Sequence, residues 1–266
     1  MSRRFGGVGL RRNIRGSSGG GAATPTMYAI AGWNNAGNEF YSGANDGPPN
    51  PTGTSPFSVA VLCRIAAVPT TGTQFVWCHG GSSGTTDGWA IYSNPTTARL
   101  NFVTFDSGGK VSPTRDWVSG DIGKVHAIVG TYDGSAIRMY FDRAQVGTST
   151  ACGTRDTPAS TVRTSIGAGD INGTDQFAAT NYEIIGTAFT DVAMSLANVQ
   201  AWCDATKAAN EIAPLGVGTT DYLWRASDNQ GLSSPWTDTR QGEALTRRGA
   251  VSALNLVTIT GPTWGW

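Results

Sequence analysis

The sequence predicts an all-β protein: an antiparallel β-sandwich with one short helix and a flexible N-terminal arm. About eight short segments alternate apolar and polar side chains with a period of two, which is typical of strands. Glycine (36 residues) and proline (12 residues) are frequent enough to supply many turns in a chain of 266 residues. Short strands joined by such turns favour a sandwich.

Residues 1–24 form the predicted arm. The charged residues of this arm are Arg3, Arg4, Arg11, Arg12 and Arg15. The first acidic residue is Glu39, so residues 1–38 carry a net charge of +5. The rest of the chain contains the other 14 of the 19 basic residues and all 19 acidic residues, so its net charge is −5. An arm rich in glycine and serine buries too little apolar surface to fold alone.

We expect residues 25–266 to form one domain, with a C-terminal extension (213–266) packed on it; a separate C-terminal module is the alternative. No apolar run of the length of a secretory signal follows Arg3 and Arg4, and no stretch approaches 18 consecutive apolar residues. The expectation is a chain made in the cytoplasm of its host, with no membrane partner.

Strands are expected at intervals along the whole domain. In the segment 57–65, alternate residues from Phe57 to Ile65 are strongly apolar and share one face. The segment 43–56 is expected to be a loop, because its prolines cannot serve a central strand. The other expected strands are 27–33, 75–78, 88–93, 98–105, one near Lys110, 123–132, 136–142, 145–147, 161–169, 182–193 and 254–259.

Local signals predict two hairpin turns and one helix, and the second turn is expected at Asp142-Arg143-Ala144. Asp133-Gly134 between two alternating apolar runs is typical of a type I′ hairpin turn, which needs positive φ at both central residues. The helix is expected to start after Ser195 as N-cap and to end before Pro214. Its expected buried face consists of Leu196, Val199, Trp202 and Cys203.

Cys63, Cys78, Cys152 and Cys203 show no CxxC spacing. Buried free thiols are the favoured interpretation, and one or two disulfides are the alternative. The two histidines, His79 and His126, have no finger-like spacing from the cysteines, which argues against zinc. Both are interpreted as structural residues.

Three linked segments carry a family resemblance. The most specific one runs from Val125 through Tyr132-Asp133-Gly134 and the strand 137–142 to Val146-Gly147. It is preceded by the strand opening 55–61 and followed by 165–168, 189–192 and the helix. Together these segments, within residues 27–212, resemble the laminin G-like members of the concanavalin A-like jelly-roll superfamily, of the kind found in tailed-phage structural proteins.

Glucanases of that superfamily carry closely spaced acids on one strand, which a retaining mechanism needs. The four glutamates, Glu39, Glu183, Glu211 and Glu243, show no such pattern. No Gly-x-Ser-x-Gly elbow lies near either histidine. We therefore expect no catalytic residues and no enzyme.

The resemblance also raises the question of calcium, because many members bind one ion at the sandwich rim. The loop from Asp170 to Asp175 is the most oxygen-rich candidate, although it lacks EF-hand spacing. No cofactor is expected, with calcium at Asp170 and Asp175 as the alternative. Three aromatic residues near strand ends, Trp89, Tyr92 and Trp117, could form a glycan platform if they are exposed, whereas burial is their more common fate.

The resemblance and the arm together predict a non-catalytic virion structural protein: a capsid decoration or a tail-associated surface protein that could also adhere to glycans. The five arginines would bind other virion proteins or copies of this chain. Nucleic acid is not the expected partner, because five charges with little aromatic interleaving give modest affinity. The alternative is a free, extracellular bacterial lectin or carbohydrate-binding module.

Overall fold

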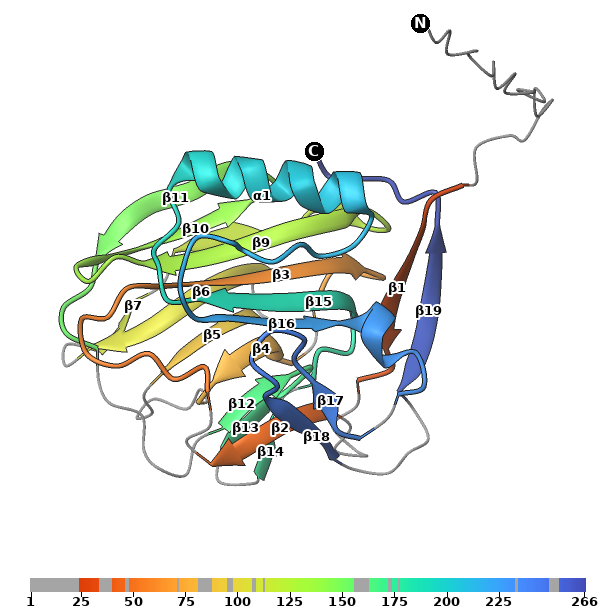
Figure 1. The fold of residues 1–266 in the computed structure, drawn as a ribbon. Helices are drawn as coiled ribbons and strands as arrows, with labels where there is room; N and C mark the ends of the chain where they lie inside the picture. Colours follow the sequence, from red (N-terminus) through yellow and green to blue (C-terminus); the bar gives the residue numbers. More distant parts are fainter. Residues whose placement is uncertain are drawn as a thin grey trace, which may run out of the picture.

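A computed structural model shows two β-sheets packed face to face (Figure 1). It describes residues 24–33, 40–45, 48–70, 72–80, 88–94, 98–106, 109–111, 113–155, 163–171, 174–176, 178–232, 234–248 and 254–266. The expected all-β sandwich with one α-helix is confirmed for these residues. The five arginines of the predicted arm lie outside them.

The first sheet has the strand order β11-β10-β9-β3-β15-β1-β19, and β16 pairs with β15 where β1 does not. On β15, Ile184 pairs with Ile30 of β1, whereas the residues from Gly186 onward pair with β16. The bounds are β1 (Thr26–Ala31), β3 (Phe57–Ile65), β9 (Val125–Tyr132), β10 (Ala136–Phe141), β11 (Ala144–Ala151), β15 (Tyr182–Thr190), β16 (Asp221–Arg225) and β19 (Asn255–Thr260).

The second sheet has the order β17-β18-β2-β12-β4-β5-β6-β7, and β8 pairs with β6. The bounds are β2 (Phe40–Asn45), β4 (Gln74–His79), β5 (Trp89–Asn94), β6 (Arg99–Asp106), β7 (Gly109–Val111), β8 (Thr114–Asp116), β12 (Arg163–Ile166), β17 (Trp236–Thr237) and β18 (Ala244–Arg248). Strand β2 is a correction, because the sequence predicted a loop from residue 43.

The C-terminal residues contribute to both sheets. Strand β16 lies beside β15 and β19 beside β1, while β18 pairs with β2. The remaining elements are the ribbon β13 (Gly169–Ile171) with β14 (Thr174–Gln176), the helix α1 (Leu196–Ala209), and the 3-10 turns η1 (Ser119–Asp121) and η2 (Ala226–Asn229).

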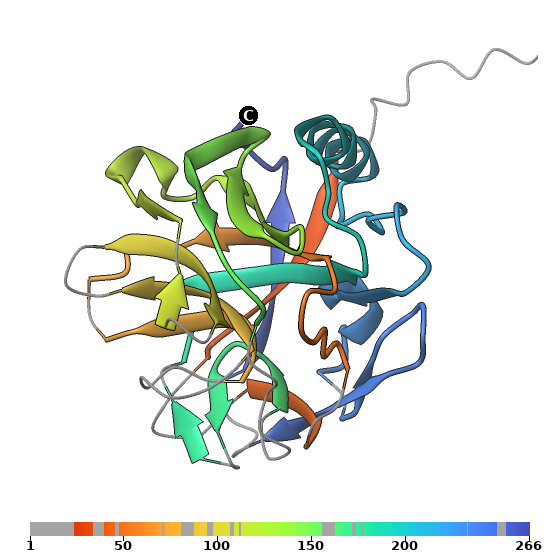
Figure 2. The ribbon, with the colours of Figure 1, turned by 90° about the vertical axis from the view of Figure 1, so that its left-hand side faces the viewer.

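Strand β3 lies in the middle of the first sheet and is buried on both faces. Phe57, Val59, Val61, Cys63 and Ile65 point into the main core between the sheets, as the alternation predicted. Ala60 and Leu62 point to the opposite face, where a second core forms against α1. Figure 2 shows this helix end-on, outside the two sheets.

The helix starts as predicted. The Ser195 hydroxyl accepts a hydrogen bond from the Asn198 backbone N–H at 3.3 Å, and Val199, Trp202 and Cys203 are buried. Leu196 corrects the prediction, because it is 43% exposed. In the first turn of a helix, a side chain one position from the N-cap can point past the end of the covering sheet. No described helix is long and apolar enough to cross a membrane.

Both hairpin turns of the middle segment lie where the sequence predicted them, but the first has a different turn type. Between β9 and β10 the loop has three residues, and only Gly134 has positive φ (97°), so the expected type I′ turn is wrong. The Asp133 carboxylate instead accepts hydrogen bonds from the Ser135 and Ala136 backbone N–H groups at 3.0 and 2.8 Å. Two consecutive positive φ values occur at the next turn, at Asp142 (49°) and Arg143 (75°).

All four cysteines belong to the described part of the chain, and no disulfide joins them. Each thiol is buried, and burial raises the pKa of Cys203 to about 12. The favoured interpretation of the cysteines as buried thiols is thus confirmed, and the disulfide alternative is wrong.

Candidate functional site

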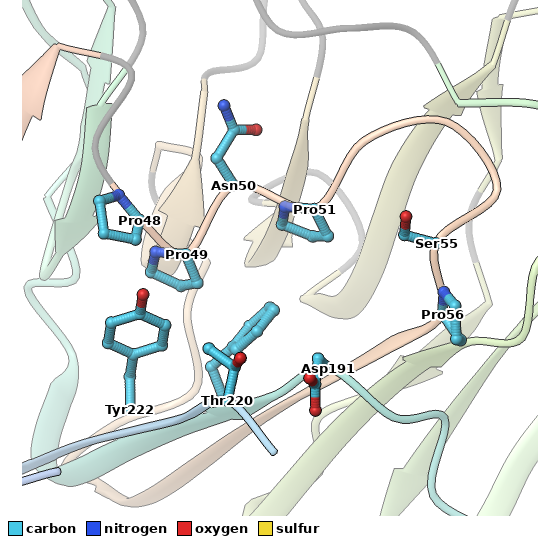
Figure 3. A pocket seen from close by; sticks show the side chains of 10 residues that line it. Pro48, Pro49, Asn50, Pro51, Ser55, Pro56, Asp191, Thr220 and Tyr222 are labelled. Carbon is cyan, nitrogen blue, oxygen red and sulfur yellow. The ribbon is translucent and has the colours of Figure 1, made fainter. Parts of the chain in front are cut away.

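A pocket of about 520 Å³ opens where three distant segments of the chain meet (Figure 3). The segments are the loop before β3, the end of β15, and the start of β16. We call this site the proline pocket. Its described lining residues are Pro48, Pro49, Asn50, Pro51, Ser55, Pro56, Phe189, Asp191, Thr220 and Tyr222.

Strand pairing brings these segments together. Phe189 of β15 pairs with Val59 of β3 on one side and with Tyr222 of β16 on the other. One residue beyond β15, the Asp191 backbone N–H donates to the Thr220 carbonyl at 3.2 Å. The pocket therefore depends on the antiparallel register of three strands.

Prolines of a single loop form one wall of the pocket. A proline ring has no N–H to donate to a strand ladder, so this segment stays outside the sheets. The rings of Pro48, Pro49, Pro51 and Pro56 give the wall an apolar surface, and the exposed Ser55 adds a hydroxyl. The sequence predicted the loop, but not what it faces.

Tyr222 supplies an aromatic ring on the opposite side, and its hydroxyl points toward Pro48 and Pro49 in Figure 3. The half-buried ring stacks on Trp224, with centroids 5.8 Å apart and planes 7° apart, and meets Phe189 edge-on at 5.9 Å. These contacts fix the orientation of the ring. Burial, followed by the charges of Glu243 and Asp238, raises the pKa of Tyr222, so its hydroxyl is a neutral donor and acceptor.

Asp191 supplies the negative charge of the pocket. Its carboxylate accepts hydrogen bonds from the backbone N–H and the hydroxyl of Thr219 at 2.9 and 2.6 Å. Burial acts to raise the pKa of Asp191, but the hydrogen bonds from Thr219 and Thr220 outweigh it and lower the pKa below its usual value. The carboxylate is therefore ionised at neutral pH.

This arrangement suits a neutral ligand with hydroxyl groups. Apolar rings can cover C–H faces, while a carboxylate and a phenol can bond hydroxyls. Among the described lining residues Asp191 is the single acid, whereas glycoside hydrolysis needs two carboxyl groups across the scissile bond. The described pocket has the features of a binding site.

The three predicted platform residues are not exposed. Trp89 is 1% exposed and packs edge-on against Trp77 at 4.8 Å, and Tyr92, 4% exposed, stacks on Phe75 at 5.2 Å. Trp117 is 4% exposed, and its indole N–H donates to the Ser93 hydroxyl at 2.9 Å. The platform prediction is wrong, because each ring is covered by its neighbours and offers no free face to a sugar.

Both histidines are structural, as expected. His79 is fully buried and shares a hydrogen bond with the Thr164 hydroxyl at 2.9 Å. Burial, and secondarily the charge of Arg155, lowers the pKa of His79 to about 3, so this ring is neutral. His126 lies between the Asp142 carboxylate (2.6 Å) and the Asp121 carbonyl (2.9 Å).

The other predicted site residues are only partly described. Asp170 and Asp175 are paired across the β13–β14 ribbon, but their side chains lie outside the described part of the structure. Among the described residues, no group of three or more His, Cys, Asp or Glu side chains could hold a metal ion. Calcium at Asp170 and Asp175 therefore remains a prediction, as do the roles of Arg3, Arg4, Arg11, Arg12 and Arg15.

Solved structures are similar to this chain at low sequence identity. A protein from Bacteroides ovatus, described as a candidate carbohydrate-binding protein, has a TM-score of 0.58 and 12% identity, over 91% of this chain and 62% of that one. A heptameric SAP-like pentraxin from Limulus polyphemus has a TM-score of 0.49 and 11% identity, over 90% of this chain and 95% of that one. No curated protein sequence matches the chain.

The family model described as "Concanavalin A-like lectin/glucanases superfamily" matches residues 38–200, which is more than half of the chain. The match includes the proline loop and β15 of the proline pocket, and β16 follows it. It contains the motif around Tyr132-Asp133-Gly134 on which the resemblance rested. This chain therefore belongs to the laminin G-like branch of the concanavalin A-like lectin/glucanase superfamily.

Proposed function

We propose that this protein is a non-catalytic carbohydrate-binding protein that holds a neutral sugar in the proline pocket. The observation that carries the proposal is that one pocket is lined both by the half-buried ring of Tyr222, which is held in place by its neighbours, and by the ionised carboxylate of Asp191. The lectin-like fold adds support, because a solved structure that shares it is described as a candidate carbohydrate-binding protein.

The charge of the pocket favours neutral over acidic sugars. Asp191 is ionised and carries no arginine or lysine partner among the described residues, so a ligand carboxylate would meet repulsion. The hydroxyl groups of a neutral sugar can instead donate to it. The prolines and Tyr222 would cover the C–H faces of the same sugar ring.

Glycan-array screening followed by calorimetry tests this function. We expect the purified chain to bind neutral glycans, and Tyr222→Ala to weaken binding by roughly two- to tenfold, since stacked aromatic contacts are worth about 0.5–1.5 kcal/mol beyond their buried area. Tyr28→Ala is the matched control, because Tyr28 is also half-buried on a strand but does not line this pocket.

Two results would contradict the proposal. Equal loss of binding in both tyrosine variants would place the sugar elsewhere or reflect instability. Release of reducing sugar from β-glucans, abolished by changing Asp106 or Asp170, would make the protein an enzyme.

We further propose that the domain is displayed on a virion, as a capsid decoration or tail-associated protein, with the arginine arm as its anchor. The support is the charge pattern: five arginines and no acid before Glu39, ahead of a family match that starts at residue 38. The free extracellular lectin remains the alternative, and truncation of the arm distinguishes the two.

A further inference from the structure

A buried guanidinium, which does not line the proline pocket, lies inside the sandwich. Arg155 follows β11, and its backbone forms bridges with Gly53 and Asp106, with its N–H donating to the Gly53 carbonyl at 3.2 Å. The residue is 2% exposed. Its side chain reaches the main core, where the guanidinium carbon lies 4.8 Å from the ring centre of Phe57 and 5.0 Å from that of Tyr132.

This cation has no protein counter-ion among the described residues. In the described part of the chain, none of its three side-chain nitrogen atoms has a hydrogen-bond partner, although a guanidinium carries five N–H donors. Of the acids at this end of the sandwich, Asp106 accepts the Gly153 N–H at 3.0 Å and Asp133 pairs with Arg138 at 2.6 Å. Neither carboxylate neutralises Arg155.

The two aromatic rings compensate only part of the cost. The free-energy cost of an unpaired charge in an apolar interior exceeds what cation–π contacts with two rings return. Burial lowers the pKa of Arg155 to about 10, so the group still carries its charge at neutral pH. The charge therefore needs a partner that the described side chains do not provide.

Other unpaired groups of this core are also donors or can become donors. The indole N–H groups of Trp89 and Trp77 have no partner among the described residues, and Trp89 lies 6.3 Å from Phe57, the ring beneath the guanidinium. His79 Nε2 is unpaired as well, and it carries the hydrogen if Nδ1 accepts from Thr164. Such a donor-rich, cationic interior favours an acceptor with negative charge.

We propose that Arg155 binds a small monovalent anion, a halide or a simple carboxylate such as acetate, between the two sheets. The phenyl and phenol rings hold the guanidinium plane, and its unpaired N–H groups face the anion. We expect the anion to enter from a surface cleft of about 540 Å³, which is lined by Cys152, Gly153 and Thr154, the three residues immediately before Arg155.

Thermal unfolding at constant ionic strength tests the site. Chloride, bromide or acetate should replace gluconate, which is too large for a packed core. A tenfold excess of anion over its Kd lowers the unfolding equilibrium constant about elevenfold, which is a Tm increase of about 3–6 °C for a chain of this size. Arg155→Gln should lose this increase.

Arg99→Gln is the matched control, because Arg99 pairs with Asp116 on the surface. It should keep the increase in Tm. The same increase in Arg155→Gln would overturn the proposal, since the anion would then act elsewhere.

A second measurement does not depend on the folding of a variant. Crystals of the unmodified chain grown in bromide should show an anomalous peak within about 3.5 Å of the guanidinium nitrogens. Absence of a peak there overturns the proposal and leaves the guanidinium held by the two rings or by water.

Discussion

His126 and His79 lie in the same sandwich but have different surroundings. The two ring nitrogens of His126 lie next to two oxygen atoms, one of the Asp142 carboxylate and one of the Asp121 carbonyl. His79 has one hydroxyl partner, and burial together with the nearby charge of Arg155 keeps its ring neutral by lowering its pKa. The same residue type therefore bridges two strands and a turn in one place and serves as a neutral core residue in the other.

The protonation of His79 predicts how stability depends on pH. Its pKa is about 3 in the folded chain and about 6.5 when unfolded, so the unfolded state binds more protons between these values. The free energy of unfolding should therefore fall as the pH decreases from 6.5, by about 2 kcal/mol at pH 5. Chemical denaturation at a series of pH values measures this fall.

His79→Leu removes the titrating group and serves as the comparison. Its free energy of unfolding should be lower overall but nearly constant between pH 6.5 and 5. If the variant shows the same fall as the unmodified chain, other groups cause the pH dependence.

The two hairpins β9–β10 and β10–β11 show how the side chains of a turn decide its length and backbone conformation. Asp133-Gly134 lies at a hairpin as predicted, but the Asp133 side chain bonds two backbone N–H groups and thereby stabilises a three-residue loop. The two-residue turn with two positive φ values forms at Asp142-Arg143. There the Asp142 carboxylate bonds the Ala127 N–H of the neighbouring strand at 2.9 Å.

Gly134 remains the sensitive position of the first hairpin. Its φ is 97°, and a Cβ would lie 3.0 Å from the Thr54 carbonyl. Gly134→Val should lower the free energy of unfolding by about 1–3 kcal/mol through backbone strain. Gly231→Val is the control, because Gly231 lies in an exposed turn with no atom within 4 Å of its Cβ position. Equal Tm values for the two variants would show that the loop tolerates a different backbone conformation.

The virion proposal depends on the N-terminal arm, residues 1–24. Residues 1–23 carry few apolar side chains, so a chain beginning at Thr24 should melt like the full chain. It should nevertheless lose incorporation into its particle or oligomer, which native mass spectrometry and particle imaging can measure. Normal assembly of the truncated chain would favour the free lectin.

Salt gives an independent measure of the same attachment. Arginine-mediated attachment should weaken between about 0.1 and 1 M salt, where the screening length falls from about 10 to 3 Å. Attachment through the C-terminal extension (213–266), which is apolar and contains tryptophans, should change little over the same range of salt. Failure of the truncated chain to fold would instead show that the arm belongs to the sandwich.

The fold class, the helix start at Ser195 and most strand positions could be predicted from the sequence. These features follow from local patterns: alternation along 57–65 predicted the face that enters the main core, and Ser195 supplies a cap through its own hydroxyl. The family motif around Tyr132-Asp133-Gly134 also lies within one hairpin. Strand β2 was missed because its small and polar residues, such as Ser42 and Gly43, give little alternation.

The residues that form the candidate sites could not be predicted from the sequence. Tyr222, Phe189 and Pro49 are distant in sequence and meet only through the register of β3, β15 and β16. Exposure could not be predicted for Trp89, because a strand residue faces core or solvent according to what packs above it. The same holds for Arg155, whose charge suggests the surface but whose backbone bridges direct it inward. Which side chains meet and which are buried depends on packing between segments that are distant in sequence, and local sequence patterns do not contain this information.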